Sequence, residues 1–118
     1  MRVYIAGPIG AGKTDKHKFI KSLQNCQAGI KASIEVLLAG HDPFCPFIDF
    51  LFFLLDSDNR ISEARIKRYS ISWLKKCDAM IVLDGWENSP GTRDEMRVAK
   101  ANGITIYHGV EALLSRNG

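Results

Sequence analysis

The sequence predicts an α/β protein with a Rossmann-like, doubly wound parallel sheet of four to five strands flanked by helices. Short, continuous apolar runs alternate along the chain with longer segments whose apolar residues recur every three or four positions. The first pattern is typical of strands buried on both faces and the second of amphipathic helices, so the alternation indicates parallel strands joined by helical crossovers. With 118 residues, 46% of them hydrophobic, residues 1–118 are expected to form a single domain.

Four segments have the composition of strands. Residues 3–6, 79–83 and 104–107 are almost entirely apolar, as strands covered by helices on both faces require. Residues 42–46 contain two prolines, which cannot donate a hydrogen bond within a sheet, so this strand is expected near an edge. If the strand order is second-first-third-fourth, it reverses between the first and third strands, where such sheets bind ligands.

Helices are expected between these strands. Residues 15–39 form a long amphipathic helix that stops at Gly40, residues 62–76 form a second one, and residues 110–116 form a short terminal helix. Another helix is expected to open at Thr92. The apolar stripe of the first helix consists of Phe19, Ile20, Leu23, Cys26, Ile30, Ile34, Leu37 and Leu38.

Residues 47–55 are apolar on nearly every side if they are helical. Such a segment is either a buried lid or core segment, or a surface that docks a second subunit. Both interpretations remain open at the level of the sequence.

Composition excludes several classes of function. The cysteines, Cys26, Cys45 and Cys77, and the three histidines are scattered without the paired spacing of a zinc or redox site, so we expect no metal and no cofactor. The net charge of +3 comes from basic residues interspersed with acidic ones, which argues against a groove for polymeric nucleic acid but suits a small anionic ligand.

The chain is also expected to have no membrane partner and to be cytoplasmic. No apolar run approaches the roughly 20 residues of a membrane-spanning helix. Met1 and Arg2 lead directly into a strand-like segment, without the pattern of a signal peptide.

The loop after the first strand has two interpretations. Its sequence at residues 7–14, GPIGAGKT, matches the P-loop pattern of nucleoside triphosphatases, in which Lys13 would contact the phosphates, Thr14 would bind the metal and Asp84 would assist magnesium. However, residues 15–18 are polar where the helix after a P-loop should be buried, and no base-binding signature follows. A glycine loop after a strand also cradles a phosphate or sugar without triphosphatase chemistry.

The polar loop at residues 85–91 follows the most apolar strand and leads into the helix expected at Thr92. This places the carboxylate of Glu95 in the first helical turn, beyond the carboxyl end of a central strand. Thr92 and Glu95 also have the spacing of a capping box, in which the carboxylate only reaches back to the Thr92 amide. In the strand order above, the two glycine-bearing loops would flank one crevice.

Three motifs occur in the same order as in a known family: VYIAGPI at residues 3–9, GHDPF at 40–44 and SPGTRDE at 89–95. Over residues 2–107 the chain resembles the nucleoside 2-deoxyribosyltransferase superfamily. It is most similar to the branch that includes 2′-deoxynucleoside 5′-phosphate N-hydrolases and small uncharacterised relatives.

The resemblance implies cleavage of an N-glycosidic bond by a homodimer or larger homo-oligomer acting on a small-molecule nucleoside or nucleotide. Glu95 matches the nucleophilic glutamate of the family, and Ser89 matches the serine that binds the 5′-phosphate in the phosphate-using branch, which favours a nucleotide. Trp86 would stack on the base or pack over the sheet end, and Asp84 would orient the sugar or end the strand. The candidate substrate-binding residues are Gly7, Pro8, Ile9, Gly10, Asp84, Trp86, Ser89, Gly91 and Thr92.

One position departs from the family pattern. In the N-hydrolase branch an aspartate eight residues before Asp78 assists the leaving base, and this chain has Ser70 there. A serine is a poor proton donor near neutral pH, so another group or a water would have to protonate the base. A non-catalytic nucleotide-binding module of the same fold, and a P-loop phosphotransferase, are therefore kept as alternatives.

Overall fold

The structure is a computed structural model that describes residues 1–9 and 18–116. In chain order its elements are β1 (Arg2–Ala6), α1 (Lys18–Leu38), β2 (Asp42–Phe44), the 3₁₀ helix η1 (Pro46–Asp49), α2 (Phe50–Leu55), α3 (Glu63–Leu74), β3 (Ala79–Val82), the 3₁₀ helix η2 (Trp86–Asn88), α4 (Pro90–Ala101), β4 (Thr105–His108) and α5 (Val110–Leu114).

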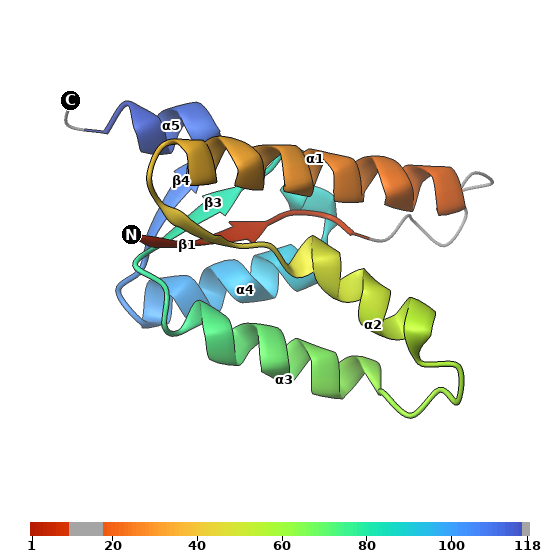
Figure 1. Cartoon of the computed structure of the whole chain (residues 1–118). Helices are drawn as coiled ribbons and strands as arrows, with labels where there is room; N and C mark the ends of the chain where they lie inside the picture. Colours follow the sequence, from red (N-terminus) through yellow and green to blue (C-terminus); the bar gives the residue numbers. More distant parts are fainter. Residues whose placement is uncertain (10–17, 117–118) are drawn as a thin grey trace.

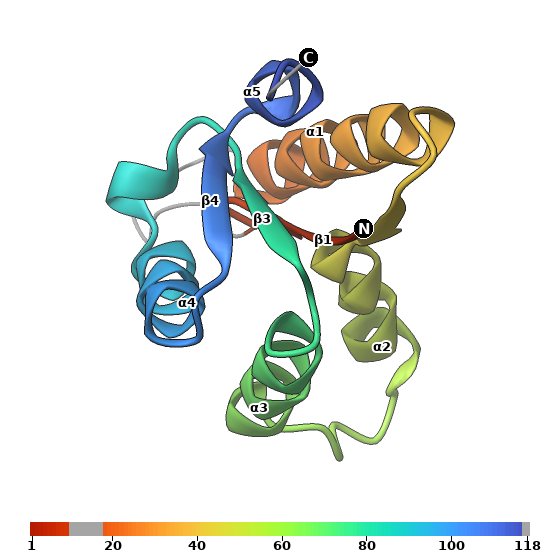
Figure 2. The same cartoon turned by 90° about the vertical axis from the view of Figure 1, so that its left-hand side faces the viewer.

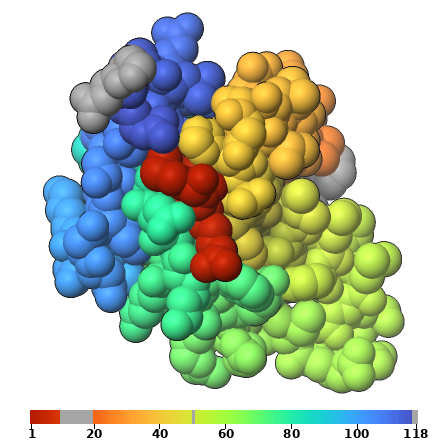
Figure 3. Space-filling view, turned by 60° about the vertical axis from the view of Figure 1, so that its left-hand side comes forward, coloured from red at the N-terminus to blue at the C-terminus, as the bar shows by residue number. Residues whose placement is uncertain are grey.

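The strands form a four-stranded parallel sheet in the order β2-β1-β3-β4 (Figure 1). The predicted α/β fold class is therefore confirmed, and the proline-containing strand β2 lies at an edge, where its missing hydrogen-bond donor costs least. The strand order reverses between β1 and β3, next to the two glycine-bearing loops. Figure 3 shows the amino-terminal residues, in red, bordered by the yellow and green segments that lead into β2 and β3.

Helices cover both faces of the sheet (Figure 2): α1 and α5 lie on one face, and α3 and α4 lie on the other. Side chains of a strand alternate between the two faces. In β1, Val3 and Ile5 join the core beneath α1 and α5, whereas Tyr4 and Ala6 join the core beneath α3 and α4. The hydroxyl of Tyr4 is therefore carried into the α3–α4 layer.

The inward face of α1 is not the apolar stripe that the sequence indicates. The structure buries the small residues Gly29, Ala32 and Ser33, together with Val36, and leaves most of the larger apolar side chains of this helix exposed. A Cβ atom at Gly29 would overlap the buried ring of Phe47, so the helix approaches the core too closely for a larger side chain at this position. Close packing, rather than hydrophobicity alone, decides which face is buried.

The apolar segment at residues 47–55 divides into two parts. Phe47 is buried in the core beneath α1, as the core interpretation requires. In α2, by contrast, Leu54 is 66% exposed and Leu55 79% exposed, and Leu51, Phe52 and Phe53 are also exposed. The interpretation as a buried core segment is therefore wrong for most of this stretch.

The start of α4 also differs from the prediction. The helix begins at Pro90, and Ser89 is its N-cap, with Oγ accepting a hydrogen bond from the Thr92 amide at 3.3 Å. Proline is favoured at the first helical position and serine at the cap, so this start satisfies both residues. Thr92 consequently lies in the first turn and Glu95 in the second, and the capping box between them does not form.

Within the described residues, no helix combines the length and the apolar character needed to cross a membrane.

Candidate active site

A cavity of about 560 Å³ lies beside the carboxyl end of β1, between the α3–α4 layer and the segment that leads into α2. Its walls are mostly apolar, and its charged side chains come from α3 and α4. The lining residues are Tyr4, Ile5, Ala6, Gly7, Ile9, Pro46, Phe47, Phe53, Glu63, Ile66, Lys67, Ser70, Ile71, Gly91 and Glu95.

The central polar contact of this cavity joins Tyr4 and Glu95. Tyr4 is fully buried in the middle of β1, and its Oη donates a hydrogen bond to Glu95 Oε2 from the second turn of α4. A buried tyrosine needs a partner for its hydroxyl, and the carboxylate provides one. The two side chains therefore hold each other in place, although their positions are 91 residues apart in the sequence.

The cavity shifts the protonation of both groups. Burial raises the pKa of Glu95 to about 7, although the Tyr4 hydrogen bond and the charge of Lys67 act in the opposite direction. Burial, followed by the charge of Glu95, raises the pKa of Tyr4 well above its usual range, so this hydroxyl keeps its proton and remains a donor. Near neutral pH the cavity thus contains a carboxyl group that is about half ionised.

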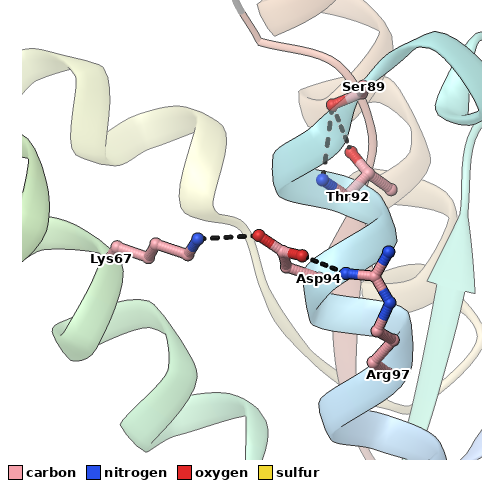
Figure 4. Close-up of polar contacts among 5 residues, drawn as sticks. All are labelled: Lys67, Ser89, Thr92, Asp94 and Arg97. Atoms are coloured by element: carbon pink, nitrogen blue, oxygen red, sulfur yellow. Dashed lines mark hydrogen bonds and ion pairs between the residues drawn. The ribbon is translucent and has the colours of Figure 1, made fainter.

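A chain of ion pairs lies next to Glu95 (Figure 4). Lys67 reaches across from α3, and its Nζ lies 2.8 Å from Asp94 Oδ2 on α4. Arg97 binds the other carboxylate oxygen of Asp94 from one turn further along α4. The hydrogen bond and charge of Lys67, followed by those of Arg97, keep the pKa of Asp94 below its usual range. Among the described residues that line the cavity, Lys67 is the only lysine or arginine.

The amino terminus of α4 forms another part of the site. Gly91, in the first turn, lines the cavity, where the amino end of the helix dipole favours an anion. Ser89 Oγ is occupied by two contacts, one with the Thr92 amide and one with Thr92 Oγ1 at 2.9 Å (Figure 4). Ser89 thus caps the amino terminus of α4.

Of the predicted site residues, four line the cavity: Gly7, Ile9, Gly91 and Glu95. Asn25 on α1 supports this wall, since its Nδ2 lies 3.3 Å from the carbonyl oxygen of Ile9. Pro8, in the first loop, instead lies against Gly85 of the second loop: a Cβ at Gly85 would be 3.2 Å from Pro8 Cγ. Gly85 has a φ of +90°, a conformation that glycine adopts without strain. The two glycine-bearing loops are therefore adjacent.

Four other predicted residues do not line the cavity. Asp84 is exposed at the end of β3, and Trp86 packs beside His108 with ring centroids 5.4 Å apart. Ser89 and Thr92 lie at the start of α4, behind Gly91. Gly10, together with the P-loop candidates Lys13 and Thr14, lies outside the described residues.

Sequence reasoning did not single out Tyr4 and Lys67. Tyr4 carries the only polar side chain in the apolar run at residues 3–6, which indicates that its hydroxyl has a partner in the core. Lys67 shares one face of α3 with Glu63 and Ser70, at spacings of three and four residues. This polar stripe on the helix of residues 62–76 is the sequence pattern that could have indicated Lys67.

The described residues contain no group of three or more histidine, cysteine, aspartate or glutamate side chains that could hold a metal ion. Cys26, Cys45 and Cys77 are free thiols in the structure.

Fold and site together define a class of α/β proteins: a doubly wound parallel sheet whose strand-order reversal borders a small cavity with a hydrogen-bonded carboxylate. The family model described as "Domain of unknown function (DUF4406)" matches residues 1–108. The chain therefore belongs to the DUF4406 family. A comparison with curated proteins finds no match.

Proposed function

We propose that this protein cleaves or exchanges the N-glycosidic bond of a nucleoside 5′-monophosphate or nucleoside, with Glu95 as the nucleophile. The observation that carries the proposal is the position of the Glu95 carboxylate: it lines an apolar cavity next to the strand-order reversal and is fixed by Tyr4. The family resemblance of the motifs around Gly7 and Glu95 supports the same chemistry.

The reaction proceeds in two displacements. Since Tyr4 binds Oε2 of Glu95, the other carboxylate oxygen attacks the anomeric carbon of the sugar. The bond from this carbon to the base nitrogen breaks, and its electron pair leaves with the base. Water then attacks the same carbon, which releases the sugar and restores the Glu95 carboxylate. The proton that this water loses neutralises the hydroxide left when a water protonates the base. If a second base attacks in place of water, the outcome is transfer.

The departing base also needs a proton. Ser70 lines the cavity at the position where the resembling family carries an aspartate, but a serine hydroxyl is too weak an acid to protonate the base near neutral pH. The proton therefore comes from water, and Ser70 contributes only a hydrogen bond.

The size and lining of the cavity fit a nucleotide-sized ligand. Its volume of about 560 Å³ falls in the range of small-molecule sites. Phe47, Phe53 and Ile66 provide apolar surface for a planar base. Gly91 leaves room for the sugar and phosphate, because no atom lies within 4 Å of the place where its Cβ would be. The amino end of the α4 dipole favours the negative charge of a phosphate.

The proposal includes a homodimer or larger homo-oligomer, as the resemblance implies. The exposed apolar side chains of α2 support it, because Leu51, Leu54 and Leu55 are open to water in the single chain. Phe53, on the same helix, lines the cavity, so a second subunit packed on α2 would lie close to the ligand. Light scattering after size-exclusion chromatography should give a multiple of the chain mass of 13.2 kDa.

The test of the activity is incubation with a panel of ribo- and deoxynucleosides and their 5′-monophosphates, with free base measured by chromatography. We expect base release by the wild type, and a loss on the order of a thousandfold or more for Glu95→Gln and Glu95→Ala. Glu87→Gln is the matched control, since Glu87 is exposed on η2. Because only ionised Glu95 attacks, kcat/KM should rise through about pH 7.

Three other results of these assays would contradict the proposed function or favour one of the two alternative functions. Base release that persists in Glu95→Ala would exclude Glu95 as the nucleophile. Nucleotide binding without base release by the wild type would favour the non-catalytic module, for which Ser70 is the supporting observation. Magnesium-dependent ATP hydrolysis that is lost in Lys13→Ala would favour the P-loop phosphotransferase.

A further inference from the structure

A second hollow of about 850 Å³ lies along α3 and reaches Asn102 at the carboxyl end of α4. Figure 2 shows α3 and α4 on the same side of the sheet. This hollow, called here the basic groove, is lined by Ala64, Lys67, Arg68, Ile71, Ser72, Lys75, Lys76 and Asn102. Four of these side chains are cationic and none is acidic. The groove therefore concentrates more positive charge than the net +3 of the whole chain.

The cations of the basic groove lie close together on one helix and its end. From Lys67 to Lys76 the chain rises by about 14 Å along α3 and its last turn, at about 1.5 Å per residue. All four side chains are exposed. No ion pair among the described residues involves Arg68, Lys75 or Lys76, so their charges are not neutralised within this part of the chain.

Helix electrostatics account for only part of this charge. The carboxyl end of α3 is partially negative, which favours lysines at positions 75 and 76. Arg68, however, lies in the middle of the helix, beyond the reach of that effect. The three unpaired cations along the groove, Arg68, Lys75 and Lys76, repel one another, and a negatively charged ligand would relieve this repulsion.

An acidic side chain binds the cation at one end of the groove. Asp94 on α4 binds Lys67, the cation at the end of the groove that faces the cavity (Figure 4). Lys67 and Ile71 line both the cavity and the groove, so these two side chains separate the two hollows. Arg68, Lys75 and Lys76 line only the groove, which makes them the specific probes of this site.

We propose that the basic groove binds a small polyanion, a compound with several phosphate groups, through Arg68, Lys75 and Lys76, with Lys67 at its inner end. Charge complementarity favours this class of ligand, because three unpaired cations over a short distance match several negative groups on one molecule. All of these cations come from α3 and its end, which suits a compact ligand. The inference does not depend on the proposed activity, since the groove lies outside the cavity.

The test is isothermal titration calorimetry of the full chain with inorganic triphosphate and with ATP at low ionic strength. We expect both to bind at micromolar concentration, and inorganic orthophosphate to bind at least about tenfold more weakly because it carries fewer charges. Triphosphate binding tighter than ATP binding identifies an inorganic polyphosphate as the ligand, and the reverse identifies a nucleoside polyphosphate. Both results support a polyanion site.

The groove variant is Arg68→Gln combined with Lys75→Gln, which should weaken triphosphate binding about tenfold or more. The matched control is Lys21→Gln combined with Lys31→Gln. These two lysines are exposed on α1, which covers the opposite face of the sheet, and their replacement removes the same net charge. Circular dichroism verifies that each variant is folded. If the groove variant is unfolded, the single variant Lys76→Gln is measured in its place.

Three results would overturn the proposal. The first is a wild type that does not bind triphosphate or ATP at millimolar concentration. The second is equal weakening in the groove variant and the α1 control, which would show an effect of net charge only. The third is binding that survives in the groove variant and moves the amide signal of Gly91 rather than that of Asn102, which would place the anion in the cavity. Binding of an oligoglutamate peptide more tightly than triphosphate would likewise overturn it, in favour of an acidic protein partner.

Discussion

Replacing Glu95 by glutamine should make the protein more stable in alkaline solution but not in acid. The pKa of this carboxyl rises from its ordinary value of 4.5 to about 7 in the folded protein, chiefly through burial. Below pH 4.5 the carboxyl is protonated in both the folded and the unfolded chain, so it causes no penalty. Between pH 4.5 and about 7 the unfolded chain loses this proton while the folded protein keeps it, so stability falls over this interval. Above about pH 7 the folded protein also holds the charge, and the full penalty is present.

The size of the effect follows from the two pKa values. Each pH unit between them corresponds to about 1.4 kcal/mol, which gives a ceiling of about 3 kcal/mol for full ionisation. Glu95 is only partly buried, and water screens some of this cost, so we expect about 2 kcal/mol. Glutamine preserves the shape and can still accept the Tyr4 hydrogen bond, so it removes mainly the charge.

The assay is chemical denaturation of the wild type and Glu95→Gln from pH 4.5 to pH 9, with Glu87→Gln as the exposed control. The difference in unfolding free energy should be near zero at the acidic end and about 2 kcal/mol in favour of Glu95→Gln at the alkaline end. Asp49, whose pKa burial raises to about 6, titrates in both proteins and cancels. A difference that stays constant with pH would refute the assignment of a destabilised carboxylate at this position.

Two further predictions concern neighbouring interactions. Lys67→Met should raise the pKa of Glu95 above about 7, because it removes a positive charge that lowers this pKa; the side-chain carboxyl signal in carbon NMR measures it, and Lys67→Arg should leave it near the wild-type value. Gly29→Ala should destabilise the protein by about 1–2 kcal/mol, because the overlap with the buried ring of Phe47 outweighs the better helix propensity of alanine. Unchanged thermal stability would mean that α1 can move away from Phe47.

Much of the fold could be predicted from the sequence. The apolar runs of β1 and β3 specify strands buried on both faces, since a half-buried strand would alternate with polar residues. Pro43 in β2 indicates an edge strand, and the glycine-bearing loops after β1 and β3 indicate where a ligand can approach the backbone. These features are local, so the order of residues along the chain already contains them.

Sequence patterns within a few residues did not predict the first residue of α4 or the hydrogen-bond partner of Glu95. Ser89, Thr92 and Glu95 are spaced so that either Ser89 or Thr92 could begin a helix, and Pro90 at the first helical position favours Ser89. That choice moves Glu95 into the second turn, where its carboxylate meets Tyr4 and not a backbone amide. Glu95 lines the cavity, but its hydrogen-bond partner was not foreseeable from the spacing.

The sequence by itself determined the α/β class, the order of the elements and the two loops beside Glu95, because periodicity, glycine and proline act over a few residues. Only the tertiary structure decided which face of α1 is buried, because the close approach of Phe47 admits Gly29 and excludes the larger side chains. It also brought Tyr4, Lys67 and Glu95 around one cavity, from β1, α3 and α4. Their shared environment, and the raised pKa of Glu95 that results from it, exist only when the sheet and its helices pack together.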